Sequence, residues 1–341
     1  MSLWAVILAG GVGSRFWPIS TPALPKQLLP LVTDAPMLRD AVDRLLPLVP
    51  AERLLILTNA QLAPAIAALL PELPAANVIA EPRPAGTAAA LAWASRTVAE
   101  RDPQAVLLSV HADWAIADGE GFRTTLLRAA NVAEAEDVLV TVGITPVRPD
   151  PGFGYIEPDG RVGQVAQKVA RFLEKPDRAR AAELIARGCL WNSGIFVWRV
   201  ARYLAEVRAH CPEVARALDA PDLAAFFAGV QSISVDVGVL ERSERVAVVP
   251  GSFGWDDVGT WAALGRVRPK DAADNALHGD VTAVRARGNV AFSAGPSVVL
   301  YGVENLVVVT IDGLTVVTTP EASADLKTLL EALPQRLRDR A

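Results

Sequence analysis

The chain has 341 residues, of which 51% are hydrophobic and 21% are charged, and these proportions are typical of a globular protein rather than a disordered or collagen-like one. Its length is sufficient to bury a large core and favours two domains of about 150 residues each. The net charge of −5 argues against an extended basic surface for nucleic acid.

Short apolar segments alternate with helical patterns through the first half of the chain. Strands are predicted at residues 3–9, 54–58, 78–80, 105–110 and 138–143, and helices at residues 37–49, 61–70, 87–100 and 122–134. This alternation is typical of parallel strands joined by crossover helices. The first half is therefore predicted to have an α/β fold.

The alternation becomes less regular from about Pro146. Strands are predicted at residues 154–157, 162–169, 172–174 and 190–198, with helices at residues 177–187, 199–210 and 212–227, so the sheet is expected to become mixed. Short β-branched segments then predict a small module of stacked strands at residues 281–285, 289–292, 297–301, 306–311 and 314–318. A final helix is predicted at residues 322–333.

The sequence shows no predicted membrane span and no export signal. The longest stretch without a charge, residues 54–71, is interrupted by prolines and polar residues, and the apolar segment 3–9 leads directly into two glycines. Cys189 and Cys211 are too few for a disulfide framework or a zinc site. We therefore expect no association with membranes and a location in the reducing environment of the cytoplasm.

The first predicted strand ends in a glycine-rich loop with the sequence Gly10-Gly11-Val12-Gly13-Ser14-Arg15-Phe16. Glycines let the backbone approach a phosphate and offer it N–H groups. The loop lacks the lysine of a Walker A motif, and Phe16 stands where the dinucleotide-binding fingerprint needs glycine, which also argues against a dehydrogenase. Prolines between residues 18 and 30 lengthen the loop, and the cations Arg15 and Lys26 bracket it, so they can fold over a bound polyphosphate.

These residues resemble the nucleotide-binding signature of the sugar-phosphate nucleotidylyltransferases, which here comprises residues 8–18 and Pro25-Lys26-Gln27-Leu28. Further motifs follow in the order typical of the mannose-1-phosphate guanylyltransferases, namely Glu81-Pro82-Arg83 with Gly86-Thr87-Ala88, Gly152-Phe153-Gly154-Tyr155-Ile156, Phe172-Leu173-Glu174-Lys175-Pro176, Trp191-Asn192-Ser193-Gly194 and Trp255-Asp256-Asp257-Val258-Gly259. The resemblance covers nearly the whole chain. It implies a doubly wound, Rossmann-like catalytic domain over residues 1–265 and a left-handed β-helix-like module with a terminal helix over residues 276–341.

The resemblance implies transfer of a nucleotidyl group from GTP to mannose 1-phosphate, which gives GDP-mannose and pyrophosphate. The attacking phosphate oxygen is already anionic near neutral pH, so no side chain has to act as a general base. Mg²⁺ is the implied cofactor, and Asp113 and Asp257 are its nominated ligands, because magnesium commonly takes one or two carboxylates besides waters and phosphates. Asp256 competes with Asp257 for this role, and His111 is either a displaced partner of Asp113 or a residue that lines the loop.

The resemblance also implies three groups of functional residues. The nucleotide-binding residues are expected to be Gly10, Gly11, Gly13, Ser14, Glu81 and Thr87. The residues that bind the sugar phosphate are expected to be Gly154, Glu174, Lys175 and Asn192, and the catalytic cations Arg15, Lys26 and Lys175. Glu81 and Thr87 are hypothesised to read the guanine edge, because a carboxylate can accept its two N–H donors, although Thr87 also fits a helix N-cap.

Two other functions stay open at this point. The first is the same chemistry on another pair of substrates, as in a glucose-1-phosphate thymidylyl- or uridylyltransferase, because sugar epimers differ by one hydroxyl. The second is a non-catalytic regulatory homologue, which the presence of all the expected cations and carboxylates disfavours. The apolar β module is expected to supply a contact for a homodimer.

Overall fold

The computed structural model describes residues 1–11, 14–311 and 313–338 and divides the chain into two compact units. The first unit contains Met1–Gly10, Ala41–Ala112 and Asp118–Trp255, and the second contains Gly11–Asp40, Asp113–Ala117 and Asp256–Ala341. Residues of the N-terminal loop are thus grouped with the C-terminal residues. The sequence predicts a catalytic domain over residues 1–265 and a β-helix-like module over residues 276–341. This division by function stays a prediction.

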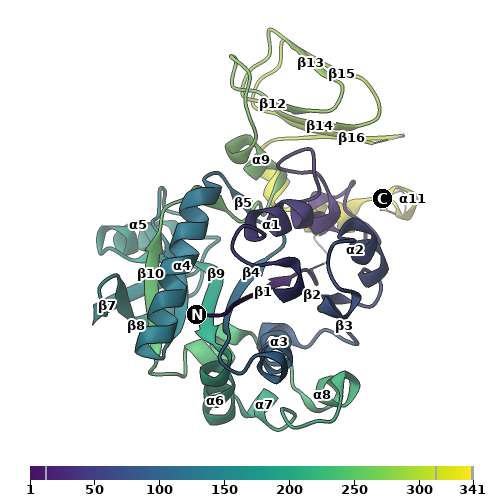
Figure 1. The fold of residues 1–341 in the computed structure, drawn as a ribbon. Coiled ribbons are helices and arrows are strands. Elements are labelled where there is room, and N and C mark those ends of the chain that lie inside the picture. The colour runs from purple at the N-terminus through teal and green to yellow at the C-terminus, as the bar shows by residue number, and fades with distance from the viewer. Residues whose placement is uncertain (12–13, 312, 339–341) are drawn as a thin grey trace. The chain divides into compact units, whose positions relative to one another are not determined.

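The first unit is built on a mixed sheet, in which nine strands of the described residues pair in the order β3-β2-β1-β4-β9-β6-β10-β8-β7 (Figure 1). These strands are β1 (Leu3–Leu8), β2 (Leu54–Asn59), β3 (Val78–Glu81), β4 (Val106–His111), β6 (Leu139–Ile144), β7 (Tyr155–Val162), β8 (Ala166–Leu173), β9 (Leu190–Arg199) and β10 (Val246–Gly251). Strand β1 pairs in parallel with β2 and β4, whereas β9 is antiparallel to both β4 and β6. The predicted α/β fold with a mixed sheet is confirmed.

Continuous apolar runs explain the central strands. All six residues of β6 are buried, as are the first five of β2, because both faces of the sheet are covered. Strand β10 was not predicted, although its first four residues are apolar and buried. Strand β8 is one strand where two were predicted. Arg171 points outward to pair with Glu157 of β7, and the register shifts beside this pair without ending the strand.

The main helices of the chain are α1 (Met37–Leu45), α2 (Ala63–Leu69), α3 (Gly86–Arg101), α4 (Gly119–Glu136), α5 (Arg178–Ala186) and α6 (Val200–His210). The helix predicted at residues 212–227 is instead two helices, α7 (Pro212–Ala215) and α8 (Leu223–Gly229). Pro221 interrupts the pattern, and the carboxylate of Asp222 caps α8 by accepting a hydrogen bond from the Ala225 amide at 2.8 Å. Within the described ranges, none of the helices is long and apolar enough to cross a membrane.

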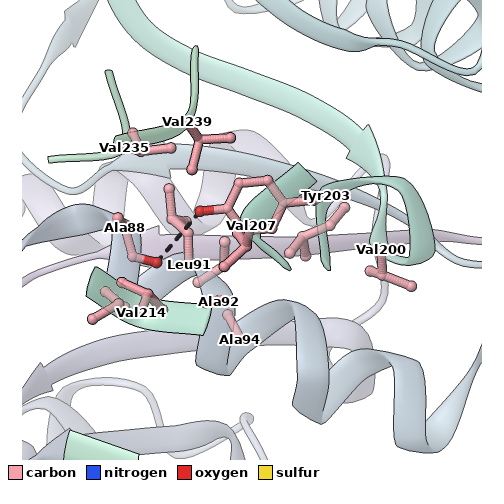
Figure 2. Close-up of a cluster of buried hydrophobic side chains, with 14 of the residues drawn as sticks. Ala88, Leu91, Ala92, Ala94, Val200, Tyr203, Val207, Val214, Val235 and Val239 are labelled. Atoms are coloured by element: carbon pink, nitrogen blue, oxygen red, sulfur yellow. Dashed lines mark hydrogen bonds between the residues drawn. The ribbon is translucent and has the colours of Figure 1, made fainter. Parts of the chain in front are cut away.

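A buried cluster joins α3 and α6 to the π-helix η5 (Asp236–Leu240) (Figure 2). The Tyr203 hydroxyl of α6 donates to the carbonyl oxygen of Ala88, in the first turn of α3, at 3.3 Å. The Tyr203 ring also stacks on Trp198, with 3.9 Å between the ring centroids. Val235 and Val239 complete the cluster at η5. This core therefore fixes the start of α3 against residues 235–240.

The second unit contains a module of short strands, as predicted. They are β12 (Ala276–His278), β13 (Val281–Val284), β14 (Val290–Ala294), β15 (Val298–Tyr301), β16 (Val307–Ile311) and β17 (Leu314–Thr318). Strands β12, β14 and β16 stack in parallel, as do β13 and β15, whereas β17 is antiparallel to β16.

Shorter elements complete the chain, namely the strands β5 (Ala115–Ile116) and β11 (Trp255–Asp256), the helices α9 (Trp261–Val267), α10 (Leu326–Ala332) and α11 (Gln335–Arg338), and the 3-10 helix η6 (Ala322–Ala324). The final helix, predicted at residues 322–333, is thus divided between η6 and α10. Asp325 separates the two and caps α10 by accepting from the Thr328 amide at 3.3 Å.

Buried asparagines tie successive turns of the strand module. The fully buried side chain of Asn289 donates to Asn275 Oδ1 at 2.9 Å and to the carbonyl oxygen of Val303 at 3.2 Å, and it accepts from the Leu306 amide at 3.0 Å. Asn275 Nδ2 donates in turn to the carbonyl oxygen of Ala286 at 2.9 Å. Buried backbone groups that lack a partner are costly, so these amides stabilise the stack.

We expect Asn289→Ala to lower the free energy of unfolding by about 2–4 kcal/mol, because it leaves several buried polar groups without partners. The measurement is urea unfolding of the full chain followed by tryptophan fluorescence. The control is Val299→Ala in β15, where the side chain is 69% exposed and the expected change is within about 0.5 kcal/mol. Equal unfolding midpoints for the two variants would contradict the role given to Asn289.

Candidate active site

The ammonium of Lys26 joins three segments of the second unit. Its Nζ donates to Asp113 Oδ2 at 3.0 Å and to the carbonyl oxygen of Asp257 at 2.7 Å, and the side chain is buried. An ammonium has three N–H donors, so one is left for another acceptor. The two aspartates nominated as metal ligands therefore lie around the cation that was predicted to hold a polyphosphate.

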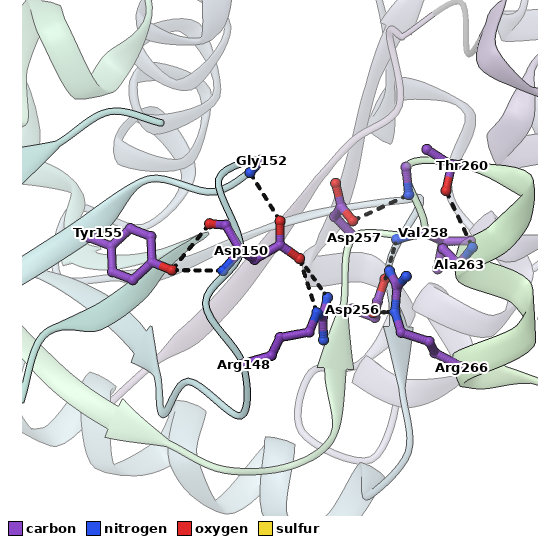
Figure 3. Close-up of polar contacts among 11 residues, drawn as sticks. Arg148, Asp150, Gly152, Tyr155, Asp256, Asp257, Val258, Thr260, Ala263 and Arg266 are labelled. Atoms are coloured by element: carbon purple, nitrogen blue, oxygen red, sulfur yellow. Dashed lines mark hydrogen bonds and ion pairs between the residues drawn. The ribbon is translucent and has the colours of Figure 1, made fainter. Parts of the chain in front are cut away.

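The neighbouring carboxylates of Asp256 and Asp257 have different surroundings (Figure 3). Asp256 is buried and accepts two hydrogen bonds from the Arg266 guanidinium, at 2.9 and 3.1 Å. Asp257 accepts from the Gly259 amide at 3.2 Å. Burial and the charge of Asp256 raise the pKa of Asp257, and the nearby Lys26 opposes this rise. Asp256 thus serves the local structure, and Asp257 is the better candidate for a ligand.

Asp113 and Asp257 fit a hard divalent cation. Both offer carboxylate oxygens, which magnesium prefers, and the charge of Asp113 raises the pKa of Asp257, so the two anions repel each other. A cation relieves this repulsion. The described part of the chain has no group of three or more histidine, cysteine, aspartate or glutamate side chains suited to a metal. Magnesium does not need one, because it keeps several waters.

Arg15 lies beside the same carboxylate. A Cβ built on Gly259 would be 2.9 Å from Asp257 Oδ2 and 3.5 Å from a guanidinium nitrogen of Arg15. Gly259 therefore leaves room for both charged groups. In the part of the chain that the structure describes, the Arg15 guanidinium has no hydrogen-bond partner, so it can bind an anionic ligand without breaking a contact.

The glycine-rich loop has open space beside its backbone. A Cβ added to Gly10 or to Gly11 would meet no described atom within 4 Å, so packing within the chain does not demand glycine at either position. The Gly11 carbonyl oxygen accepts from Gln27 Nε2 at 2.9 Å, which ties the loop to η2 (Lys26–Leu28). Gly13 lies outside the described residues, and Ser14 begins the 3-10 helix η1 (Ser14–Phe16).

The residues predicted to hold the sugar come together in the first unit. A Cβ on Gly154 would be 3.1 Å from Glu174 Oε2 and 3.5 Å from the Cβ of Asn192, and the Gly154 carbonyl oxygen accepts from the Asn192 amide at 2.8 Å. Lys175 Nζ donates to Glu174 Oε1 at 2.7 Å in an exposed pair. Exposed pairs contribute little free energy, so a ligand can take over either partner at small cost.

A network that sequence reasoning missed supports the turn before Gly154 (Figure 3). Asp150 pairs with Arg148 at 2.9 Å and accepts from the Gly152 amide at 3.0 Å. The Tyr155 hydroxyl donates to the Asp150 carbonyl oxygen at 3.1 Å. The Arg148 guanidinium also lies 5.1 Å from the ring centroid of Trp191. These contacts fix the turn that carries Gly154, one of the residues predicted to bind the sugar phosphate.

Glu81 and Thr87 lie in the first unit, at the end of β3 and in the first turn of α3. Burial raises the pKa of Glu81 to about 7, and no hydrogen-bond partner of its carboxyl occurs among the described residues. Thr87 is not an N-cap, because Ala85 holds that position. The Thr87 hydroxyl instead accepts from the Val235 amide at 2.9 Å. Its O–H remains a donor, so the base-reading hypothesis stays a prediction.

Two further residues bear on the sequence analysis. His111 ends β4 in the first unit. Burial raises the pKa of Asp236, and the charge of His111 opposes this rise. The Asp236 carboxylate accepts from Asn192 Nδ2 at 2.8 Å. Sequence reasoning missed Asp236. The only available signal was one carboxylate within the otherwise apolar run Val-Asp-Val-Gly-Val-Leu at residues 235–240.

The α/β sheet of the first unit and the cations and carboxylates of the second unit suit an enzyme that acts on phosphate compounds. A family model described as nucleotidyl transferase matches residues 4–274, so the chain belongs to this family and is a nucleotidyltransferase. Enzymes of this family generally use a divalent metal ion.

Within the family, the chain is similar to mannose-1-phosphate guanylyltransferases. The enzyme of Salmonella muenchen is 35% identical, over 96% of this chain and 72% of that protein, and the enzyme of Escherichia coli K12 is also 35% identical, over 97% and 73%. A crystal structure from Thermus thermophilus, described as a mannose-1-phosphate geranyltransferase, is 33% identical with a TM-score of 0.89 and covers 97% of this chain and 99% of its own.

We expect Glu81→Gln to raise the free energy of unfolding by an amount that depends on pH. The folded-state pKa of about 7 lies above the ordinary value of 4.5, so the folded protein loses stability as the pH rises between these values, by at most about 3 kcal/mol. Glutamine does not titrate, so its advantage over glutamate grows across this window and is constant above it.

The measurement is urea unfolding between pH 4.5 and 8.5, with Glu52→Gln, which changes an exposed carboxylate, as the control. A difference between Glu81→Gln and wild type that is constant across this range would show that Glu81 does not carry the raised pKa.

Proposed function

We propose that the protein transfers the guanylyl group of GTP to mannose 1-phosphate, giving GDP-mannose and pyrophosphate. The observation that carries this proposal is the 35% identity, over nearly the whole chain, to relatives named for this activity. The same comparisons do not favour the thymidylyl- or uridylyltransferase alternative. A regulatory homologue without catalysis is set aside because the chain is an enzyme.

The reaction requires alignment more than proton transfer. An oxygen of the sugar phosphate attacks the α-phosphorus of GTP, a new P–O bond forms, and the bond to the β-phosphate oxygen breaks as pyrophosphate leaves. The nucleophile is anionic near neutral pH, so no general base is needed. Holding the reacting groups in line and offsetting the charge that develops are then the main tasks of the protein.

The cations of the second unit suit the triphosphate. Arg15 has an uncommitted guanidinium, and Lys26 is preorganised by its two hydrogen bonds and keeps a third N–H donor. Asp113 and Asp257 would hold the Mg²⁺, which supplies charge neutralisation to the phosphates when bound. The open backbone of Gly10 and Gly11 leaves room for the phosphates beside their N–H groups.

The side chains of the first unit suit the parts of the substrates that donate hydrogen bonds. Glu81, when ionised, can accept from the two N–H groups of the guanine edge. Glu174, Asn192 and the backbone at Gly154 lie around one point and can bind several hydroxyls of a hexose. Lys175, in an exposed pair, can turn from Glu174 to the phosphate of the sugar.

The assembly and the location of the protein are also part of the proposal. We propose a homodimer that acts in the cytoplasm and binds neither nucleic acid nor membranes. Cys189 and Cys211 are buried free thiols, which suits a reducing compartment. The net charge of −5 suits small anionic substrates that bind at local cations rather than a polyanion.

The substrate proposal predicts a clear preference in a pyrophosphate-release assay with purified protein and Mg²⁺. GTP, ATP, UTP and dTTP are each combined with mannose 1-phosphate and with glucose 1-phosphate. We expect the highest kcat/KM for GTP with mannose 1-phosphate. A preference for dTTP or UTP with glucose 1-phosphate would overturn the proposed substrates.

The proposed site predicts that Asp113→Asn lowers kcat by at least about 10²-fold, because a metal ligand is lost while size is kept. Lys175→Met should lower kcat/KM for the sugar phosphate by about 10²-fold, because a charge-assisted hydrogen bond is lost. Asp159→Asn and Lys168→Met change exposed residues of the β7–β8 hairpin and serve as matched controls. Near-normal activity of Asp113→Asn and Lys175→Met would refute the assignment.

A further inference from the structure

The side chain of Asn192 is held at both ends. Its Nδ2 donates to Asp236 Oδ1 at 2.8 Å, and its Oδ1 accepts from the Gly194 amide at 3.2 Å. A carboxylate can only accept hydrogen bonds, so Asp236 requires the NH₂ end of the amide to face it. One N–H and one lone pair of Asn192 are left over, and their directions are fixed.

Asp236 is itself held firmly. The segment before it lies on the start of α3, where the Ala88 amide donates to the carbonyl oxygen of Ile233 at 3.2 Å and Thr87 Oγ1 accepts from the Val235 amide at 2.9 Å. Gly86, with φ of 79°, leaves no room for a Cβ beside the Ile233 carbonyl oxygen. Asp236 is itself the first residue of the π-helix η5, and Val239 of this helix packs into the core of Figure 2. Such π-helical turns are often found at functional sites.

The carboxylate of Asp236 is placed at a cost to the fold. Burial raises its pKa, and the charge of Glu174 raises it further, whereas the Asn192 amide lowers it. Glu174 is one of the residues predicted to bind the sugar phosphate. Asp236 is therefore close enough to these residues to interact with their charges. Burial of a carboxylate costs free energy, so packing alone does not account for Asp236 within the otherwise apolar residues 235–240.

We propose that Asp236 is a positioning residue of the hexose subsite, which fixes the Asn192 amide so that hexose 1-phosphates differing in one hydroxyl are told apart. This inference rests on the proposed function. A fixed amide offers its donor and acceptor in one arrangement, and a sugar whose hydroxyl is inverted leaves one of them unpaired. A site built to hydrogen-bond a hydroxyl rejects an analogue that lacks it much more strongly than an apolar pocket does.

The test is Asp236→Asn, which keeps the shape of the side chain and removes its strict requirement for a hydrogen-bond donor from Asn192. An amide at this position can donate or accept, so only the Gly194 amide still fixes which way the Asn192 amide faces. We expect KM for the preferred hexose 1-phosphate to rise about tenfold and KM for GTP to change less than twofold. The ratio of kcat/KM between mannose 1-phosphate and glucose 1-phosphate should fall at least tenfold.

Val239→Ala is the control for a merely structural role of η5. Val239 is fully buried in the same helix, so its truncation lowers the midpoint of thermal unfolding but leaves the Asn192–Asp236 pair in place. We expect the discrimination ratio of Val239→Ala to equal that of wild type. The inference is overturned if Asp236→Asn keeps the wild-type ratio, or if both variants lose discrimination in proportion to their loss of stability.

The design separates this inference from the proposed function. The ratios are measured with mannose, glucose and galactose 1-phosphates, each with the nucleotide that wild type prefers. A wild type that prefers another hexose contradicts the proposed substrates, and the effect of Asp236→Asn on discrimination still decides whether Asp236 positions Asn192. A wild type that prefers mannose 1-phosphate, together with an unchanged Asp236→Asn, contradicts this inference alone.

Discussion

The buried ammonium of Lys26 is the constraint on which the candidate site of the second unit depends. A buried charge without partners costs several kcal/mol, so the fold must bring oxygen atoms to it. Those atoms come from Asp113 and Asp257, which are 87 and 231 residues away along the chain. The cation therefore joins the loop after β1 to two distant acidic segments through hydrogen bonds within the chain. Such preorganisation is what a phosphoryl-transfer site needs, because little reorganisation is then left for the reaction itself.

In the first unit, the start of α3 has the comparable organising role. The segment at Ile233 lies too close to Gly86 for any side chain there, and it is held by hydrogen bonds to the first turn of the helix. The Thr87 hydroxyl holds Val235, and the next residue, Asp236, holds Asn192. A residue predicted to read the base and a residue predicted to bind the sugar are thus linked through one short segment. This link holds Thr87 and Asn192 in a defined arrangement.

The sequence predicted the parts of the fold that depend on local patterns. Strands such as β6 are continuous apolar runs, as burial on both faces of the sheet requires. It did not predict where helices break, as at Pro221, or that Arg171 leaves β8 uninterrupted, because these outcomes depend on capping and cross-strand partners. The candidate metal and sugar residues were predicted from motifs. Asp236 was not, because its role depends on a partner 44 residues away and on no local pattern.

The distribution of charge in the two units follows from the chemistry of the proposed substrates. Phosphate oxygens only accept hydrogen bonds at neutral pH, so they suit Arg15, Lys26 and Lys175, which only donate. Guanine and a hexose present N–H and O–H donors, which suit the carboxylates of Glu81 and Glu174. Burial gives this arrangement a cost, as the raised pKa of Glu81 indicates. A ligand that donates to the Glu81 carboxylate offsets this cost, whereas one that presents an acceptor there adds to it. If Glu81 reads the base as proposed, selectivity arises from the same burial that raises its pKa.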